Sequence, residues 1–296
     1  MRTSSSDLLD RYQTASAHKA RCCLVRLFIV LLLILRFAQA SANGQTAMPM
    51  LSYVLSEDMP RAAHHFTQGL VYDDEVLYES TGKYGQSALF IYDKKDLSLR
   101  HSLSLDKDQF AEGITVLKDK LYQLEWRSGL LHVYSLSLKP LHTLPIASEG
   151  WGLTTDGEQL ILSDGTDTLF FLDPRTAATV KTIHVQDAHG KHWDNLNELE
   201  WVNGVLLANV WHQDAVLAID PITGIVIGQY DFSPLSQRAS RAMPFRDGEQ
   251  VLNGLAWDST TQTLLVTGKD WPRWFRITLT PTPSSLPHTL LQQGSP

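Results

Sequence analysis

Five stretches of the sequence share one pattern and decide the fold: QGLVYDDEVLYESTG (68–82), EGITVLKDKLYQLEW (112–126), WGLTTDGEQLILSDG (151–165), NELEWVNGVLLANVW (197–211) and NGLAWDSTTQTLLVTGK (253–269). Each has an aliphatic residue at its third position. After a turn a second aliphatic residue follows, seven positions later in four stretches and nine later in the fifth. The first aliphatic residues are 39 to 56 residues apart. Hairpins that recur about every 40–50 residues are typical of β-propellers, in which each repeat forms one blade. We therefore predict an all-β protein, a five-bladed β-propeller.

The rest of the chain between Phe66 and Leu279 agrees with this prediction. Short apolar runs are separated by turn signals such as Asp156-Gly157 and Asn203-Gly204, which favour hairpins. The polar segment 235–250 is expected to hold either one short helix or a long loop. A β-sandwich with chance similarity between its hairpins is the alternative, but it would not be expected to keep the seven-residue offset in four repeats.

The first 40 residues have the pattern of a secretory signal peptide. A long basic region precedes nine apolar residues, LFIVLLLIL (27–35), and the A-x-A site AQA (38–40). Nine apolar residues are too few to cross a bilayer, which takes roughly 20, and an uncleaved N-terminal anchor is the alternative. We expect cleavage after Ala40, export to the periplasm or the medium, and no membrane contact after cleavage.

The remaining chain is predicted to contain one folded domain with a loose segment at each end. Residues 41–63 mix small and polar types and are expected to be a flexible lead-in. The catalytic propeller domain is placed at 64–280, and the Pro- and Ser-rich segment 281–296 is expected to be disordered.

Composition excludes several classes of function. Of the 25 basic and 32 acidic residues, 6 and 2 lie within residues 1–40, so the chain after cleavage carries 19 basic and 30 acidic residues and a net charge of −11. This charge argues against a nucleic-acid partner. The only cysteines, Cys22 and Cys23, lie in the signal segment, so no disulfide is expected. A monomer is the default expectation.

The repeat register predicts a site where the hairpins meet near the propeller axis. Two residues before the first aliphatic residue stands a first ring of five residues: Gln68, Glu112, Trp151, Asn197 and Asn253. Five residues after the second aliphatic residue stands a second ring: Gly82, Trp126, Gly165, Trp211 and Lys269. Both rings belong to the hairpin end opposite the turn, so they should converge at one mouth of the central channel. An apolar pocket with a few placed polar groups is typical of a small-ligand site. Ordinary packing between blades is the alternative for each tryptophan.

Glu112 is the only acid in the two rings. Tryptophan walls and poor solvation would raise the pKa of its carboxyl toward neutrality, which suits a general acid/base. A structural glutamate that binds backbone amides is the alternative. Because no second carboxylate stands at an equivalent position, the pair that a glycosidase needs is not supported.

No metal site or cofactor is predicted. His184, His189, His192 and His212 match no zinc-binding spacing, and the stretch Asp187–Asp194 is interpreted as a polar loop. The stretch Ser163–Asp167 is only loosely similar to a calcium loop and is equally expected in a hairpin turn.

Nine short strings, in order along the chain, resemble the plant-type glutaminyl cyclases, a family that also occurs in bacteria. They are FTQGL (66–70), YESTGKYGQS (78–87), FAEG (110–113), GWGL (150–153), SDGT (163–166), LNELE (196–200), NVW (209–211), LNGLAW (252–257) and VTGKDWP (266–272). The resemblance implies a five-bladed propeller that converts the N-terminal glutamine of peptides or proteins into pyroglutamate and releases ammonia without a metal.

The resemblance also implies roles for individual residues. The catalytic glutamate falls on Glu112, and polar contacts fall on Gln68, Asn197 and Lys269. The aromatic substrate pocket falls on Phe66, Phe110, Trp126, Trp151 and Trp211. Lys269 is expected either to carry less charge than usual beside tryptophan or to pair with Glu112.

Two other functions stay open. One is a non-catalytic exported propeller that binds peptides or proteins through the same aromatic mouth. The other is a propeller lactonase or related hydrolase, which needs several acidic or histidine ligands around a calcium ion and is disfavoured by the single acid of the rings.

Overall fold

The computed structural model describes residues 48–61, 65–243 and 248–280, so the predicted signal peptide (1–40) and C-terminal tail (281–296) lie outside the described residues. Each repeated stretch forms an antiparallel hairpin, as predicted. In the fourth repeat Val202 pairs with Val205 across Asn203 and Gly204. These two turn residues have φ values of 50° and 89°, which a two-residue hairpin turn of type I′ requires.

Four of the hairpins are extended by the two strands that follow them into a meander of four strands, and the fifth is extended by β20 (Arg273–Thr280) and by β1 (Met50–Pro60) from the other end of the described chain. The first sheet contains β2 (Thr67–Asp73), β3 (Val76–Thr81), β4 (Ala88–Asp93) and β5 (Leu99–Ser104). The second contains β6 (Ala111–Leu117), β7 (Lys120–Glu125), β8 (Leu130–Ser135) and β9 (Pro140–Pro145). The third contains β10 (Leu153–Thr155), β11 (Leu160–Ser163), β12 (Thr168–Leu172) and β13 (Thr179–His184).

The remaining strands form one eight-stranded sheet. Its first half contains β14 (Leu196–Val202), β15 (Val205–Val210), β16 (Ala215–Ile219) and β17 (Val226–Asp231). Its second half contains β18 (Leu252–Asp258), β19 (Thr263–Gly268), β20 (Arg273–Thr280) and β1 (Met50–Pro60). The strands β1 and β17 are parallel neighbours and join the two halves.

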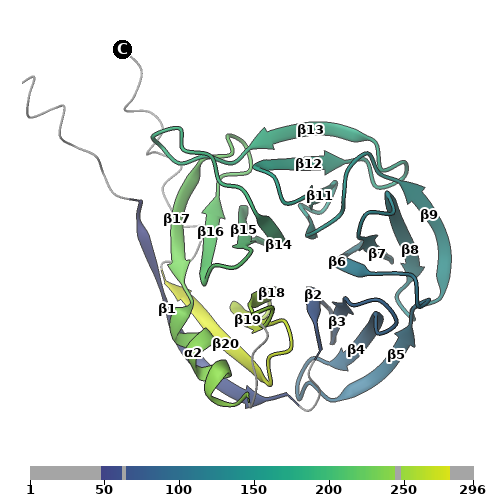
Figure 1. Ribbon diagram of the computed structural model, residues 1–296, viewed down its shortest axis with the longest axis horizontal. Coiled ribbons are helices and arrows are strands. Elements are labelled where there is room, and N and C mark those ends of the chain that lie inside the picture. Colours follow the sequence, from purple (N-terminus) through teal and green to yellow (C-terminus); the bar gives the residue numbers. More distant parts are fainter. Residues whose placement is uncertain (1–47, 62–64, 244–247, 281–296) are drawn as a thin grey trace, which may run out of the picture. The chain divides into compact units, whose positions relative to one another are not determined.

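The first strand of each hairpin faces a common centre (Figure 1). The inner strands β2, β6, β10, β14 and β18 contact one another in a closed circuit, with β18 against β2. The hydrophobic clusters lie between neighbouring sheets: one, for example, combines Phe171 and Ile183 with Leu199 and Leu217. The protein is therefore nearly all-β with a β-propeller-like arrangement. Its five inner strands surround the centre, where their side chains can line a site.

The flexible lead-in predicted for residues 41–63 is wrong over residues 50–60, which form β1. This strand pairs antiparallel with β20 from Ser52 to Pro60 and parallel with β17 through Met50 and Leu51. It buries Leu51 and packs Tyr53 edge-on against Phe232, with the two ring centroids 4.9 Å apart. Most residues of β1 are exposed or only partly buried, and this gives the sequence the composition of a loop. The folded domain therefore begins before residue 64.

The polar segment 235–250 contains a short helix rather than a long loop alone. Helix α2 (Ser233–Arg241) carries a proline in its first turn and buries Leu235 and Ala239. Residues 244–247 lie outside the described residues. In the described part of the chain, no helix is long and apolar enough to span a membrane.

Candidate active site

Irregular pairing at the start of the inner strands aims the first-ring residues inward. In β2, β6, β14 and β18 the register shifts around Gln68, Glu112, Asn197 and Asn253. A β-bulge bends its strand and re-aims the side chain at that point. All four shifts occur at positions that the repeat register singled out.

Glycines after the first-ring residues let the inner strands approach one another closely. A Cβ atom on Gly69 would lie 2.6 Å from the backbone nitrogen of Ile114, and one on Gly113 would collide with the backbone of Leu153. The fourth repeat has Glu198 at this position. Its carboxyl is buried, and burial together with the charge of Glu200 raises the pKa of Glu198 well above its ordinary value, against a lowering effect of the backbone N–H groups of Leu255 and Leu70. The same backbone contacts that close the circuit thus bring the ring residues together.

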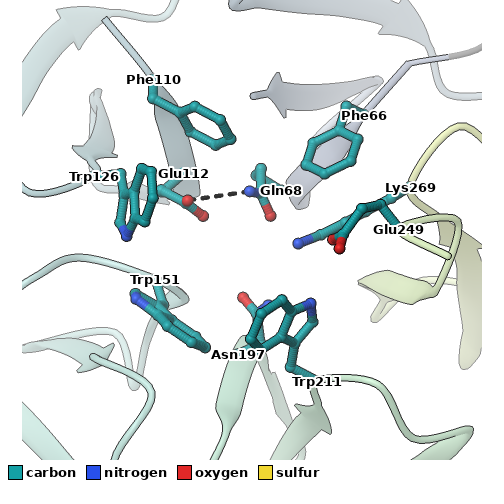
Figure 2. A pocket seen from close by; sticks show the side chains of 10 residues that line it. All are labelled: Phe66, Gln68, Phe110, Glu112, Trp126, Trp151, Asn197, Trp211, Glu249 and Lys269. Atoms are coloured by element: carbon teal, nitrogen blue, oxygen red, sulfur yellow. Dashed lines mark hydrogen bonds between the residues drawn. The ribbon is translucent and has the colours of Figure 1, made fainter. Parts of the chain in front are cut away.

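A cavity of about 330 Å³ lies where the rings converge (Figure 2). It is lined by Phe66, Gln68, Phe110, Glu112, Trp126, Trp151, Asn197, Trp211, Glu249 and Lys269. All nine predicted site residues are in this set. The other three ring residues are Asn253, Gly82 and Gly165, which do not line the cavity. Its volume is at the lower end of the range for small-molecule sites.

Glu112 lies at one side of the cavity, and its carboxyl is almost completely buried, with the residue 5% exposed. Gln68 Nε2 donates a hydrogen bond of 3.1 Å to Glu112 Oε1. Asn253 Nδ2 in turn donates to Gln68 Oε1 at 3.2 Å, so Asn253 supports Gln68 from behind. Burial raises the pKa of Glu112 well above its ordinary value, and the charge of Glu149 adds to this rise, whereas Lys269 opposes it.

Lys269 enters the cavity between aromatic rings. Its Nζ lies 4.9 Å from the ring centroid of Phe66 and 5.9 Å from that of Trp211. Burial lowers the pKa of Lys269, against the raising effect of Glu112 and Glu249. Among the described side chains, Lys269 and Glu112 form no ion pair within 4.0 Å. Of the two expectations for Lys269, the direct pair with Glu112 is therefore not found among the described residues, and burial shifts the pKa of the amine in the direction of its neutral form.

The aromatic side chains of the walls pack against one another, edge to face for Trp151 and Trp211 and tilted for Phe110 and Trp126. The ring centroids of Trp151 and Trp211 are 5.5 Å apart at 87°, and those of Phe110 and Trp126 are 5.2 Å apart. Two second-ring glycines make room for these rings. A Cβ on Gly82 would lie 2.8 Å from Phe110 Cζ, and one on Gly165 would lie 2.8 Å from Trp151 Cη2.

Two polar atoms at the cavity have no partner among the described residues: Asn197 Oδ1 and the indole Nε1 of Trp211. Both are buried, and buried polar groups are normally hydrogen-bonded. A ligand that supplies one donor and one acceptor would satisfy both.

Glu249, which belongs to neither ring, also lines the cavity, so the cavity has a second acid beside Glu112. It lies beside Lys269 in Figure 2, in the segment that precedes β18. The repeat register could not find it, since it lies outside both rings. Glu149 was missed as well, although it stands two residues before Trp151, just as Phe66 and Phe110 stand two residues before Gln68 and Glu112.

The histidines and acids singled out for a metal do not meet at the cavity. Asp167 interacts with His184 and His192 outside the cavity, and Asp164 Oδ1 accepts a hydrogen bond from the backbone of Thr166 within its own turn. Within residues 48–61, 65–243 and 248–280, no group of three or more His, Cys, Asp or Glu side chains is arranged to hold a metal ion.

The chain matches a family of known proteins over most of its length. The family described as "Glutamine cyclotransferase" matches residues 28–279. The chain belongs to this family. The resemblance expected from the nine short strings is thereby confirmed.

Two relatives of the glutamine cyclotransferase family illustrate the similarity. The "Glutaminyl-peptide cyclotransferase" of Arabidopsis thaliana is 38% identical over 228 residues, which cover 75% of this chain and 69% of the relative. The crystal structure of Myxococcus xanthus glutaminyl cyclase superposes with a TM-score of 0.73 at 35% identity, and the match covers 79% of this chain and 98% of that one.

Proposed function

We propose that the protein is a glutaminyl-peptide cyclotransferase, which converts the N-terminal glutamine of peptides or proteins into pyroglutamate and releases ammonia. Membership of the glutamine cyclotransferase family and the names of the two relatives support the reaction. The observation that carries the mechanism is the buried Glu112 carboxyl, with its raised pKa, in a tryptophan-lined cavity. A carboxyl that titrates nearer to neutral pH can both accept and return a proton during one turnover.

In the proposed reaction, the neutral α-amine of the substrate attacks its own γ-carboxamide carbon. A C–N bond forms, the carbonyl oxygen becomes an oxyanion, and ionised Glu112 takes the proton from the amine. Glu112 then returns this proton to the amide nitrogen, the old C–N bond breaks, and ammonia leaves. The aromatic walls would hold the glutamine side chain folded toward its amine, which lowers the entropic part of the barrier.

The other polar groups divide the remaining tasks. One N–H of Gln68 is bound to Glu112, so Gln68 orients the carboxyl. Lys269 and the unpartnered indole N–H of Trp211 would donate hydrogen bonds to the oxyanion. The unpartnered Oδ1 of Asn197 would accept an N–H from the substrate.

We also infer a five-bladed propeller. The eight-stranded sheet divides at β1 and β17 into two four-stranded halves, each with its own inner strand. With the three separate sheets this gives five four-stranded units, a number equal to that of the sequence repeats. The pairing of β1 with β17 would then be a contact between two neighbouring blades.

Export remains part of the proposal and rests on the sequence of residues 1–40. An N-terminal sequence that begins at Ser41 in protein from the native host would support cleavage. An intact N-terminus on protein that sediments with membranes would support the anchor instead.

The proposed reaction is tested by incubating the purified protein with a Gln-initiated dipeptide and measuring both ammonia and pyroglutamyl product. Ammonia and pyroglutamyl peptide in equal amounts, unchanged by a chelator, are expected. Binding of the dipeptide without ammonia release would support the peptide-binding alternative and overturn the enzyme.

A further inference from the structure

We propose that Glu149, which does not line the cavity, is a positioning residue that holds Trp126 and Trp151 in the cavity walls. The expected effects on kcat/KM rest on the proposed function. The structural part of the proposal does not depend on that function, because it concerns contacts of the free protein.

The first observation is that a single carboxylate oxygen binds both indoles. Glu149 Oε2 accepts hydrogen bonds from Trp126 Nε1 at 3.1 Å and from Trp151 Nε1 at 3.2 Å. An indole N–H can only donate, and a bond to an ionised acceptor is stronger than a neutral one. The two tryptophans belong to different sheets, since Trp126 follows β7 and Trp151 precedes β10. Glu149 therefore ties two walls of the cavity together.

The second observation is that Arg127 completes this arrangement. Its Nε donates to Glu149 Oε1 at 3.0 Å, and its guanidinium lies 4.0 Å from the ring centroid of Trp126. Trp126 is thus held at its edge by Glu149 and covered on one face by Arg127. An exposed ion pair alone contributes little, so the two indole bonds rather than the Arg127–Glu149 pair carry the proposal.

The backbone next to Glu149 is fixed as well. A Cβ atom on Gly150 would lie 2.8 Å from Leu124 Cβ, so the chain at residue 150 rests directly on β7. Trp151 N donates to the carbonyl of Ser163 at 2.9 Å. With the two residues that follow it held, the Glu149 side chain starts from a defined position, which a residue with a functional orientation needs.

The charge of Glu149 also acts on the acid/base group. Burial raises the pKa of Glu149, but the hydrogen bonds from Trp151, Arg127 and Trp126 together lower it by more. The pKa of Glu149 therefore lies below its ordinary value. Glu149 is therefore ionised at neutral pH. Of the charged groups around the cavity, Lys269 and Glu149 act on Glu112, while Glu249 acts on Lys269.

Two substitutions separate the two roles. Glu149→Ala removes both indole bonds, and displacement of the walls by about 1 Å predicts a loss of roughly 10- to 100-fold in kcat/KM. Glu149→Gln retains an oxygen that can accept from the indoles but removes the charge. Its kcat/KM should fall less, and the acidic limb of its pH profile should move to lower pH, because loss of a like charge lowers the pKa of Glu112. Glu158→Gln, at an exposed position in the turn of the same hairpin, is the matched control.

The decisive readout without activity is the indole N–H spectrum of protein labelled with ¹⁵N-tryptophan, with signals assigned through Trp126→Phe and Trp151→Phe. Both signals should move in Glu149→Gln and stay in place in Glu158→Gln. If they do not move, and kcat/KM of both Glu149 variants stays within twofold of wild type, the proposal is overturned. If the wild type has no cyclase activity, the spectrum still decides whether Glu149 holds the indoles. A Glu149→Ala variant that fails to fold leaves Glu149→Gln to decide.

Discussion

Replacing Glu112 with glutamine tests the centre of the proposed mechanism with a minimal change in shape. The amide oxygen of the new side chain can still accept the 3.1 Å hydrogen bond from Gln68 Nε2, so the local network can persist. What disappears is the group that takes and returns a proton. General acid–base catalysis contributes about 10²- to 10⁴-fold, which corresponds to roughly 3–5 kcal/mol of barrier. We therefore expect Glu112→Gln to lose at least ~10²-fold in kcat.

The structure also predicts that this variant is not less stable than wild type. The folded state raises the pKa of Glu112, so its carboxyl favours folding below its unfolded pKa, and this contribution is lost as pH rises through the folded value. Glutamine carries no charge at any of these pH values. The free energy of unfolding at pH 8 should accordingly be equal to or greater than that of wild type.

The assay measures ammonia and pyroglutamyl product from a Gln-initiated dipeptide across pH 5–9 for wild type, Glu112→Gln and the surface control Glu158→Gln. Thermal unfolding of the same samples shows that the variants are folded. A folded Glu112→Gln protein whose kcat stays within tenfold of wild type, with an unchanged pH profile, would refute the acid/base role. An equally large loss of kcat in Glu158→Gln would show that the loss comes from the protein preparation and not from the missing carboxyl of Glu112.

Three more predictions concern the cavity wall, the buried acid Glu200 and strand β1. Gly82→Ala places a methyl group against Phe110, so kcat/KM should fall relative to wild type. An unchanged kcat/KM would argue against a tightly packed wall. Burial raises the pKa of Glu200 to about 8, so the free energy of unfolding should decrease from pH 5 to pH 8, and Glu200→Gln should flatten this slope in urea titrations; an equal slope would contradict the assignment. Removal of residues 1–60 deletes β1 and should lower Tm by several degrees relative to a chain that lacks only residues 1–40, because it uncovers Phe232 and the pairing edge of β20; equal Tm values would show that β1 adds no stability.

Repeat phase predicted much of the site because a closed circuit of inner strands turns equal positions in sequence into neighbours in space. Gln68 and Glu112 lie 44 residues apart, yet they are hydrogen-bonded since both stand two residues before the first aliphatic residue of their hairpin. The same argument placed Asn253 in the first ring. Its side chain is turned toward Gln68 and Thr67 and is hidden from the cavity, which the spacing of residues cannot reveal.

What the sequence could not predict lies outside the repeats. Glu249 reaches the cavity from an irregular segment that has no counterpart in the other hairpins. Glu149 has a counterpart position, but there its equivalents Phe66 and Phe110 are aromatic, so a carboxylate that binds two indoles breaks the pattern. Strand β1 has no repeat partner at all, and its pairing with β20 depends on the opposite end of the chain.

The pairing of β1 with β20 has a consequence for the order of events during synthesis. Ser52 pairs with Thr280, so the two strands are separated by more than two hundred residues. During translation β1 has no antiparallel partner until nearly all of the described chain has left the ribosome, and until then its backbone N–H and C=O groups form an open edge. Such long-range pairings slow folding, and open strand edges promote aggregation. Closure of the circuit should therefore be a late step in folding.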